Sequence, residues 1–313
     1  MTKVGDRSEA AFLDGLGISN ELAEILLMSE FAAVRNTAPL TYWLVDTFEM
    51  RWSFLVEELE TGLQGQQEQI MRLRGGGAPD DGVSLTDEGG ATSSSDAGAG
   101  GEFEAVTAPL HLDGHTMLWR AGWRDPCERI YDVDAGEVNI RSSRYARGDF
   151  SSFDRVYYTP QIETANKFLQ FAKARHTPSE LYVFQVAVPW ALIESLKTTI
   201  LCCKGGTASI WRAIVWHSRN IIKPPRNLFH VAHAELLIGD VASKSQISYG
   251  RKASPDELTA ADALTVDIDV DGQKTNALQW VFQGDGELKF EEACQGGGWM
   301  HTLGAFRASV KDE

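Results

Sequence analysis

Cysteine is scarce in this chain of 313 residues. Only four are present, Cys127, Cys202, Cys203 and Cys294, and none of them stands at a spacing typical of metal ligands. The adjacent Cys202 and Cys203 are also poorly placed to form a disulfide with each other. We therefore expect reduced thiols, a cytoplasmic protein and no metal site.

Basic residues are few as well. The chain has 29 lysines and arginines against 44 aspartates and glutamates, a net charge of −15. The imbalance lies in the flanks, because residues 1–101 carry −11, residues 102–250 carry +2 and residues 251–313 carry −6. Binding of nucleic acid needs a clustered positive surface, so nucleic acid is not an expected partner. The mildly basic middle can still hold a small anionic ligand.

Long hydrophobic runs are also missing. The apolar stretches fall far short of the roughly 20 residues that cross a bilayer, and the opening "MTKVGDRSEAAF" lacks the apolar core of a secretory signal. We therefore expect no membrane partner. The apolar content of 43% is ample for the core of one or two domains.

Residues 1–74 form a predicted N-terminal helical region. Ser19 or Asn20 is a plausible N-cap. Apolar residues then recur at helical spacing, at Trp43, Leu44, Phe48, Phe54, Leu55 and Leu59. Such a stripe fits a helical hairpin packed on the main domain. It also fits a dimerisation arm, so an oligomer formed through these helices is an alternative.

Residues 75–102 are rich in glycine, serine and aspartate. They offer almost nothing apolar to bury, which predicts a flexible acidic linker.

Short β-type runs dominate from residue 103 onward, with a main domain expected over 103–250 and a β-rich C-terminal extension over 251–313. Strands are predicted at "TMLWRAG", "RVYYTP", "LYVFQVAVP", "RAIVWHS", "AELLIGDVA", "ALTVDIDVD" and "NALQWVFQ", and helices at "ETANKFLQFAKARH" and "PWALIESL". The helices do not alternate regularly with the strands. The expected fold class is therefore α+β and not a doubly wound parallel sheet.

Four polar positions in these strands stand out. Alternation puts Tyr157 and Thr159 on one face of "RVYYTP". Arg120 lies in an apolar strand directly after a tryptophan, and Glu235 opens the apolar run "LLIG". Their ordinary structural alternatives are sheet packing for Tyr157 and a solvated strand edge for Glu235.

For Arg120 the structural alternative is an ion pair with Asp125 or Asp154.

The three strands together resemble the signature strands of the ADP-ribosyltransferase-like superfamily, over roughly residues 116–242. "LWRAG" is similar to its first strand, with Arg120 in place and Gly122 one residue late. "VYYTPQIETANKFLQFA" is similar to its second strand and following helix, and "HAELLIG" to its glutamate-bearing strand. The arrangement also resembles proteins of mushroom-type fungi. The resemblance implies a split β-sandwich with NAD bound as a substrate in the cleft between two small sheets.

The resemblance also implies roles. Glu235 would stabilise the oxocarbenium-like cation that forms when the nicotinamide–ribose bond breaks. Arg120 would hold the pyrophosphate or adenosine ribose, with Gly122 close by, while Tyr157 would stack on nicotinamide and Thr159 would hydrogen-bond at the strand end.

His233 stands two residues before the glutamate, where arginine-modifying members often carry Gln or Glu. An arginine target is therefore not predicted, and His233 is itself a candidate catalytic residue.

The implied function is ADP-ribosyl transfer from NAD to a macromolecule, with a protein as the possible acceptor. An NAD glycohydrolase of toxin or self-defence type, in which water replaces the acceptor, is a close variant. A non-catalytic interaction module that keeps the fold is the alternative from another class. Chemistry on RNA ends is a further variant, against which the acidic flanks weigh.

Overall fold

The computed structural model describes residues 4–75, 108–132, 134–139, 145–151, 154–155, 157–175, 181–244, 246–267 and 273–302. The predicted linker at 75–102 lies outside these residues except for its first position. Contacts divide the chain into two compact units, residues 1–52 with 109–313, and residues 53–108. The expected boundary after residue 74 does not coincide with this division, because the first N-terminal helices belong to the larger unit.

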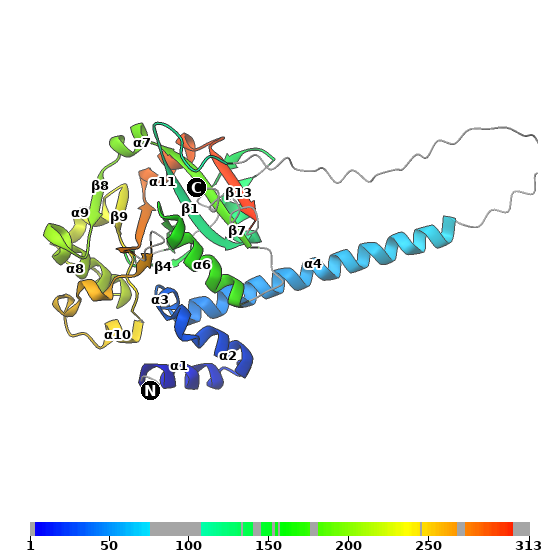
Figure 1. Ribbon diagram of the computed structural model, residues 1–313, viewed down its shortest axis with the longest axis horizontal. Coiled ribbons are helices and arrows are strands. Elements are labelled where there is room, and N and C mark those ends of the chain that lie inside the picture. The colour runs from blue at the N-terminus through cyan, green and yellow to red at the C-terminus, as the bar shows by residue number, and fades with distance from the viewer. Residues whose placement is uncertain are drawn as a thin grey trace, which may run out of the picture. The chain divides into compact units, whose positions relative to one another are not determined.

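The described residues form a mixed α+β structure with N-terminal helices and several small sheets, which confirms the expected class (Figure 1). The helices are α1 (Val4–Gly15), α2 (Asn20–Leu27), α3 (Ala32–Arg35), α4 (Leu40–Gly75), α5 (Arg124–Ile130), α6 (Ile162–Arg175), α7 (Trp190–Ser195), α8 (Ala208–Arg219), α9 (Phe229–Ala232), α10 (Gln246–Gly250) and α11 (Asp285–Ala293). The strands are β1 (His115–Trp123), β2 (Tyr131–Asp132), β3 (Glu137–Val138), β4 (Tyr145–Arg147), β5 (Asp154–Arg155), β6 (Tyr157–Tyr158), β7 (Leu181–Pro189), β8 (Thr198–Leu201), β9 (Leu236–Asp240), β10 (Thr265–Asp267), β11 (Lys274–Asn276), β12 (Leu278–Phe282) and β13 (Gly298–Thr302).

Two sheets make up the centre of the larger unit. One has the strand order β1-β7-β13 and is antiparallel, and the other has the order β6-β12-β9-β8 with β8 parallel to β9. Alternate side chains of each strand point to opposite faces. One apolar cluster accordingly combines Leu118 and Val186 of the first sheet with Leu236 and Phe282 of the second. The two sheets therefore share one core and pack against each other.

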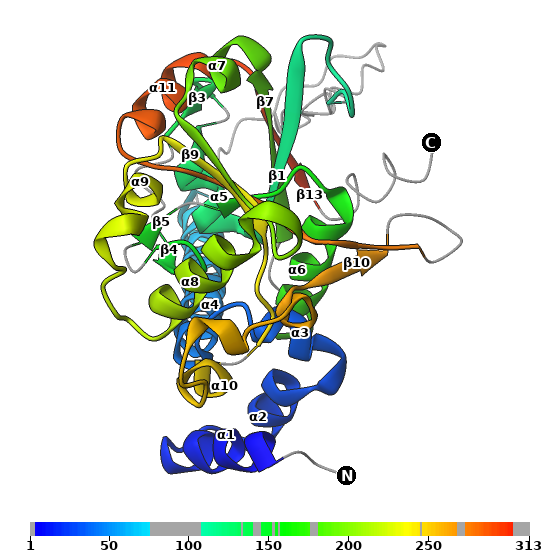
Figure 2. The ribbon, with the colours of Figure 1, turned by 90° about the vertical axis from the view of Figure 1, so that its left-hand side faces the viewer.

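Helices cover the outer face of each sheet (Figure 2). On the three-stranded sheet, Met117 and Val183 pack with Leu169 of α6. The N-terminal helices lie beyond α6, where Leu26 and Trp43 join Phe171 in a further cluster. Ser19 caps α2 by accepting a hydrogen bond from the Leu22 amide at 3.3 Å, which confirms one of the two expected caps.

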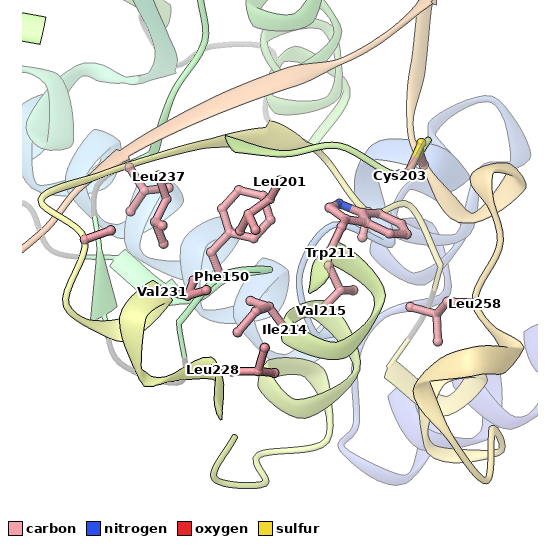
Figure 3. Packing of buried hydrophobic residues seen from close by; sticks show 14 of the residues in the cluster. Phe150, Leu201, Cys203, Trp211, Ile214, Val215, Leu228, Val231, Leu237 and Leu258 are labelled. Atoms are coloured by element: carbon pink, nitrogen blue, oxygen red, sulfur yellow. The ribbon is translucent and has the colours of Figure 1, made fainter. Parts of the chain in front are cut away.

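The outer face of the four-stranded sheet is covered by α8. Trp211, Ile214 and Val215 of this helix point toward Leu201 of β8 and Leu237 of β9 (Figure 3). The strand predicted at "RAIVWHS" is therefore wrong, because these residues lie inside α8. Isoleucine, valine and tryptophan favour strands locally, but the buried positions recur at helical spacing and the packing decides the outcome.

The C-terminal residues belong to the central sheet. Strand β12 lies between β6 and β9, so residues expected to form an extension after residue 250 complete the four-stranded sheet. The tail also contains α11, which its β-rich appearance did not predict. Strands β10 and β11 pair with each other in antiparallel orientation. Among the described residues, none of the helices is long and apolar enough to cross a bilayer.

Candidate functional site

The two central sheets are joined at one point and then separate. Strand β1 meets the chain after β6 through one bridge, in which the Trp119 amide donates to the Thr159 carbonyl at 2.8 Å and the Thr159 amide donates to the Trp119 carbonyl at 2.9 Å. No further bridge joins β1 to β6 in the described part of the chain. Residues 120–123 and 157–158 therefore diverge on the same side of this bridge.

A cavity of about 170 Å³ lies where the strands diverge. It is lined by Thr37, Ala38, Tyr42, Trp43, Asp46, Trp119, Arg120, Ala121, Gly122, Trp123, Cys127, Gly148, Asp149, Tyr157, Tyr158, Thr159, Thr164, Ala165, Phe168, Ala172, Arg175, Val241, Leu278 and Gln279. Four of the six candidate residues predicted from the sequence are among them: Arg120, Gly122, Tyr157 and Thr159. The structure thus brings together the residues predicted to bind the cofactor.

Arg120 lies across the divergence. Its Nη1 donates to the Tyr157 carbonyl at 3.1 Å, and its side chain is partly buried. The side chains of Asp125 and Asp154, its predicted ion-pair partners, lie outside the described part of the structure. Arg120 therefore places a fixed positive charge in the cavity wall, because an arginine is always protonated in proteins.

Tyr157 packs closely over a glycine. A Cβ atom on Gly148 would lie 1.9 Å from the Tyr157 hydroxyl, so this position requires glycine. Burial raises the pKa of the Tyr157 hydroxyl, and the neighbouring Asp149 carboxylate raises it further. Burial likewise raises the pKa of Tyr158. Both phenols therefore stay protonated at neutral pH and can act as hydrogen-bond donors but not as bases.

Thr159 makes a local hydrogen bond at the start of α6. Its hydroxyl accepts a hydrogen bond from the Gln161 amide at 3.1 Å, a local contact that suits a threonine before a helix. The Gln161 side chain in turn accepts from the Thr164 hydroxyl at 2.9 Å and from the Leu278 amide at 2.7 Å. Thr159 consequently has a structural role beside its place in the cavity wall.

Four buried donor groups on the cavity wall have no hydrogen-bond partner among the described residues. They are the indole Nε1 of Trp119, the hydroxyls of Tyr157 and Tyr158, and Nε of Arg175. Trp119 is 7% exposed and Tyr158 is 2% exposed. A buried donor without a partner is rare and costs about 1–3 kcal/mol. A ligand that offers acceptor atoms in this cavity would relieve that cost.

Two carboxylates on the wall were not singled out in the sequence. Asp149 binds Arg219 and also accepts from the Ala242 amide at 2.7 Å and the Gln279 side chain at 2.8 Å. Asp46 binds Arg175 at 2.5 Å. Their partners lie far away in the chain, so no local pattern marks them. Because each carboxylate is paired with an arginine, neither adds net negative charge to the wall.

Glu235 does not line the cavity. It precedes β9, and the cavity residue Val241 follows the other end of that strand, about 20 Å away at about 3.3 Å per residue. Its Oε1 accepts from Lys289 at 2.6 Å and its Oε2 from the Lys197 amide at 2.9 Å. Glu235 and Arg120 therefore do not share this cavity. The contacts fit a residue that fastens α11 to the β8–β9 edge.

The Glu235→Gln substitution is expected to lower stability in a pH-dependent way. The hydrogen bond from Lys289, followed by that from the Lys197 amide, lowers the pKa of Glu235. Because the pKa is lower in the folded state, the ionised carboxylate stabilises the protein at pH values above the ordinary glutamate pKa of about 4.3. This stabilisation is lost as the pH falls through the lowered pKa. Urea unfolding should show wild type more stable than the variant at pH 7, and the difference should shrink as the pH is lowered below about 4. A constant difference would contradict this account.

His233 lies outside the cavity too. It is exposed and follows α9, with its amide bonded to the Phe229 carbonyl at 3.1 Å. Burial raises the pKa of Cys127, the cysteine on the cavity wall, to about 12, so its thiol is not ionised at neutral pH. Within the described residues, no group of His, Cys, Asp and Glu could hold a metal ion.

The cavity is thus a mostly aromatic and apolar space. Two arginines, Arg120 and Arg175, stand in its wall and each donates to a backbone carbonyl, and four buried donors of the wall lack partners among the described residues. No family model, curated protein or solved structure matches this chain in the three comparisons.

Proposed function

We propose that this protein binds NAD in the cavity beside the β1–β6 bridge, in an ADP-ribosyltransferase-like split β-sandwich. The observation that carries the proposal is that Arg120, Gly122, Tyr157 and Thr159 line one cavity. These residues come from segments about 40 positions apart and were selected from the sequence as NAD-binding positions.

The size and chemistry of the cavity support a ring-bearing ligand. A cavity of about 150 Å³ holds one benzene molecule, so about 170 Å³ accommodates one six-membered ring with a small substituent. The nicotinamide ring has this size, and its carboxamide oxygen accepts hydrogen bonds of the kind that the Trp119 and Tyr158 donors can supply. Arg120 at the rim would pair with the pyrophosphate, whose geometry suits a guanidinium group.

The sequence resemblance further supports an activity for the bound NAD. This activity is ADP-ribosyl transfer to a macromolecule, with water as the alternative acceptor. In that reaction the bond between nicotinamide and ribose breaks, nicotinamide leaves with the bonding electrons, and the acceptor attacks the ribose carbon. The placement of Glu235 favours a second candidate, a module that binds NAD without cleaving it. Among the described residues, the carboxylates that line the cavity, Asp46 and Asp149, are each paired with an arginine.

The Arg120→Ala substitution is expected to weaken NAD binding by about 10- to 100-fold, since hydrogen bonds to charged groups contribute about 1.5–3 kcal/mol. Isothermal titration calorimetry of the full chain measures this directly. Arg226→Ala is the matched control, because Arg226 is exposed and does not line the cavity. Absence of NAD binding by the folded wild-type protein would overturn the proposal.

Nicotinamide release separates the candidate activities. Release that requires an added protein acceptor indicates a transferase, and release at full rate without one indicates a glycohydrolase. Binding without release indicates the non-catalytic module. Glu235→Gln should leave any release unchanged, and its abolition in a well-folded variant would return Glu235 to the catalytic role that the sequence predicted.

A further inference from the structure

The second half of α4 is exposed along its length. Every residue from Glu57 to Met71 is exposed. Helices in isolation are marginally stable in water, because most helical stability in proteins comes from packing of an apolar face. A helix of this length that is exposed on all sides therefore calls for a partner.

This part of α4 carries an apolar seam. Leu55, Leu59, Leu63 and Ile70 are 53%, 67%, 57% and 49% exposed. They are separated by four, four and seven residues, so they return to the same side of the helix at each turn or second turn. Gln66 occupies the intervening turn. The seam has the spacing by which two helices pack along their length.

Two glycines interrupt the middle of the helix. Glycine is unfavourable inside a helix, and a Cβ atom on Gly62 or Gly65 would meet nothing within 4 Å. No crowding among the described residues therefore explains them. Gly62 directly precedes Leu63 and lies beside the seam, where a small residue allows a second helix backbone to approach closely. Gly65 lies two residues after Leu63, about 200° around the helix, and therefore faces away from the seam.

We propose that a second copy of this chain packs antiparallel on this seam. Charge selects the orientation. The sequence of the segment begins with Glu58 and Glu60 and ends with Arg72 and Arg74. A parallel pair would bring ends of like charge together, whereas an antiparallel pair brings the acidic end of each copy to the basic end of the other.

The same register pairs the apolar residues. A two-fold axis between Gln64 and Gly65 sets Leu59 of one copy opposite Ile70 of the other, and Leu63 opposite Gln66. Gly62 then lies within about one turn of the crossing point. The contact is self-complementary, as a two-fold dimer requires. It involves no residue of the cavity, so it stands or falls independently of NAD binding.

The mass of the full chain in solution tests the proposal. Analytical ultracentrifugation of wild type at micromolar concentration should give twice the monomer mass of 34.5 kDa. Leu59→Glu combined with Leu63→Glu should raise the dissociation constant at least about 100-fold, since burying two unpaired charges opposes association. Thr61→Glu is the control, because Thr61 is exposed on the opposite side of the helix and should leave the dimer intact.

A monomeric wild type, or a dimer that survives the double substitution, would overturn the proposal. Circular dichroism checks that the larger unit of each variant remains folded.

Engineered disulfides test the orientation. Equal amounts of Leu59→Cys and Ile70→Cys proteins should form a mixed disulfide under mild oxidation, because antiparallel packing brings these positions together. Leu59→Cys alone should remain uncrosslinked. Efficient crosslinking of Leu59→Cys to itself would show a parallel pair and contradict the antiparallel arrangement.

Discussion

Asp149→Ala is expected to lower the free energy of unfolding by about 3–5 kcal/mol, the usual result when one member of a buried ion pair is removed. Both side chains of the pair are almost fully buried, with 2% of Asp149 and 3% of Arg219 exposed. The substitution would leave the Arg219 guanidinium without its counter-charge. It would also remove the acceptor of the Ala242 amide and of the Gln279 side chain.

Urea unfolding followed by tryptophan fluorescence measures this loss. The control is Asp267→Ala, because the Asp267–Lys274 pair is exposed and its atoms are 4.0 Å apart. Its removal should change stability by less than about 0.5 kcal/mol. If the two substitutions lowered the free energy of unfolding equally, the hydrogen bonds and the ion pair of Asp149 would not stabilise the protein more than an exposed pair does.

Arg175→Ala is expected to have an effect of similar size, about 3–5 kcal/mol, and to act on the N-terminal helices. Arg175 lies at the end of α6 and donates to Asp46 at 2.5 Å, to the Thr47 hydroxyl at 3.0 Å and to the Trp43 carbonyl at 3.3 Å. Its guanidinium carbon also lies 4.9 Å from the centre of the Trp43 ring. One side chain thus fastens the start of α4 to the sheet-bearing part of the unit.

Hydrogen exchange measured by mass spectrometry should show faster exchange of residues 20–47 in the Arg175→Ala variant. The affinity for NAD should fall as well, because Trp43 and Asp46 line the proposed binding cavity. Arg251→Ala, at an exposed position, is the control and should change neither property. Unchanged exchange in the Arg175→Ala variant would show that the apolar contacts of the N-terminal helices suffice to hold them.

Local patterns predicted much of the fold. The α+β class, the helix at 162–175 and the strands that contain Arg120 and Tyr157 follow from spacing and from β-branched and aromatic content. The strand expected at "RAIVWHS" failed because the same residue types can also form the buried face of a helix. The place of β12 between β6 and β9 could not be predicted either, since strand order depends on pairings distant in sequence.

The site was predictable to the extent that strand alternation determines it. Arg120 and Tyr157 could be selected from short segments, and they do lie together. The separation of Glu235 from them could not be seen, because a strand motif does not say at which end of the sheet its first residue lies. Asp46 and Asp149 carry no local signal, since their importance comes from arginines about 130 and 70 positions away.

The cavity wall begins at Thr37 and ends at Gln279, which constrains how the protein can be made. Synthesis proceeds from the N-terminus, so Trp43 and Asp46 emerge long before the strands that they will meet. Contacts between such distant residues form slowly, because a long loop must close first. The apolar face of the N-terminal helices remains uncovered until α6 arrives, and the inner face of β1 remains uncovered until β12 arrives. Exposed apolar surface of this kind favours aggregation. Yield in bacterial expression should therefore depend on temperature and on chaperone supply more than the modest size of the chain suggests.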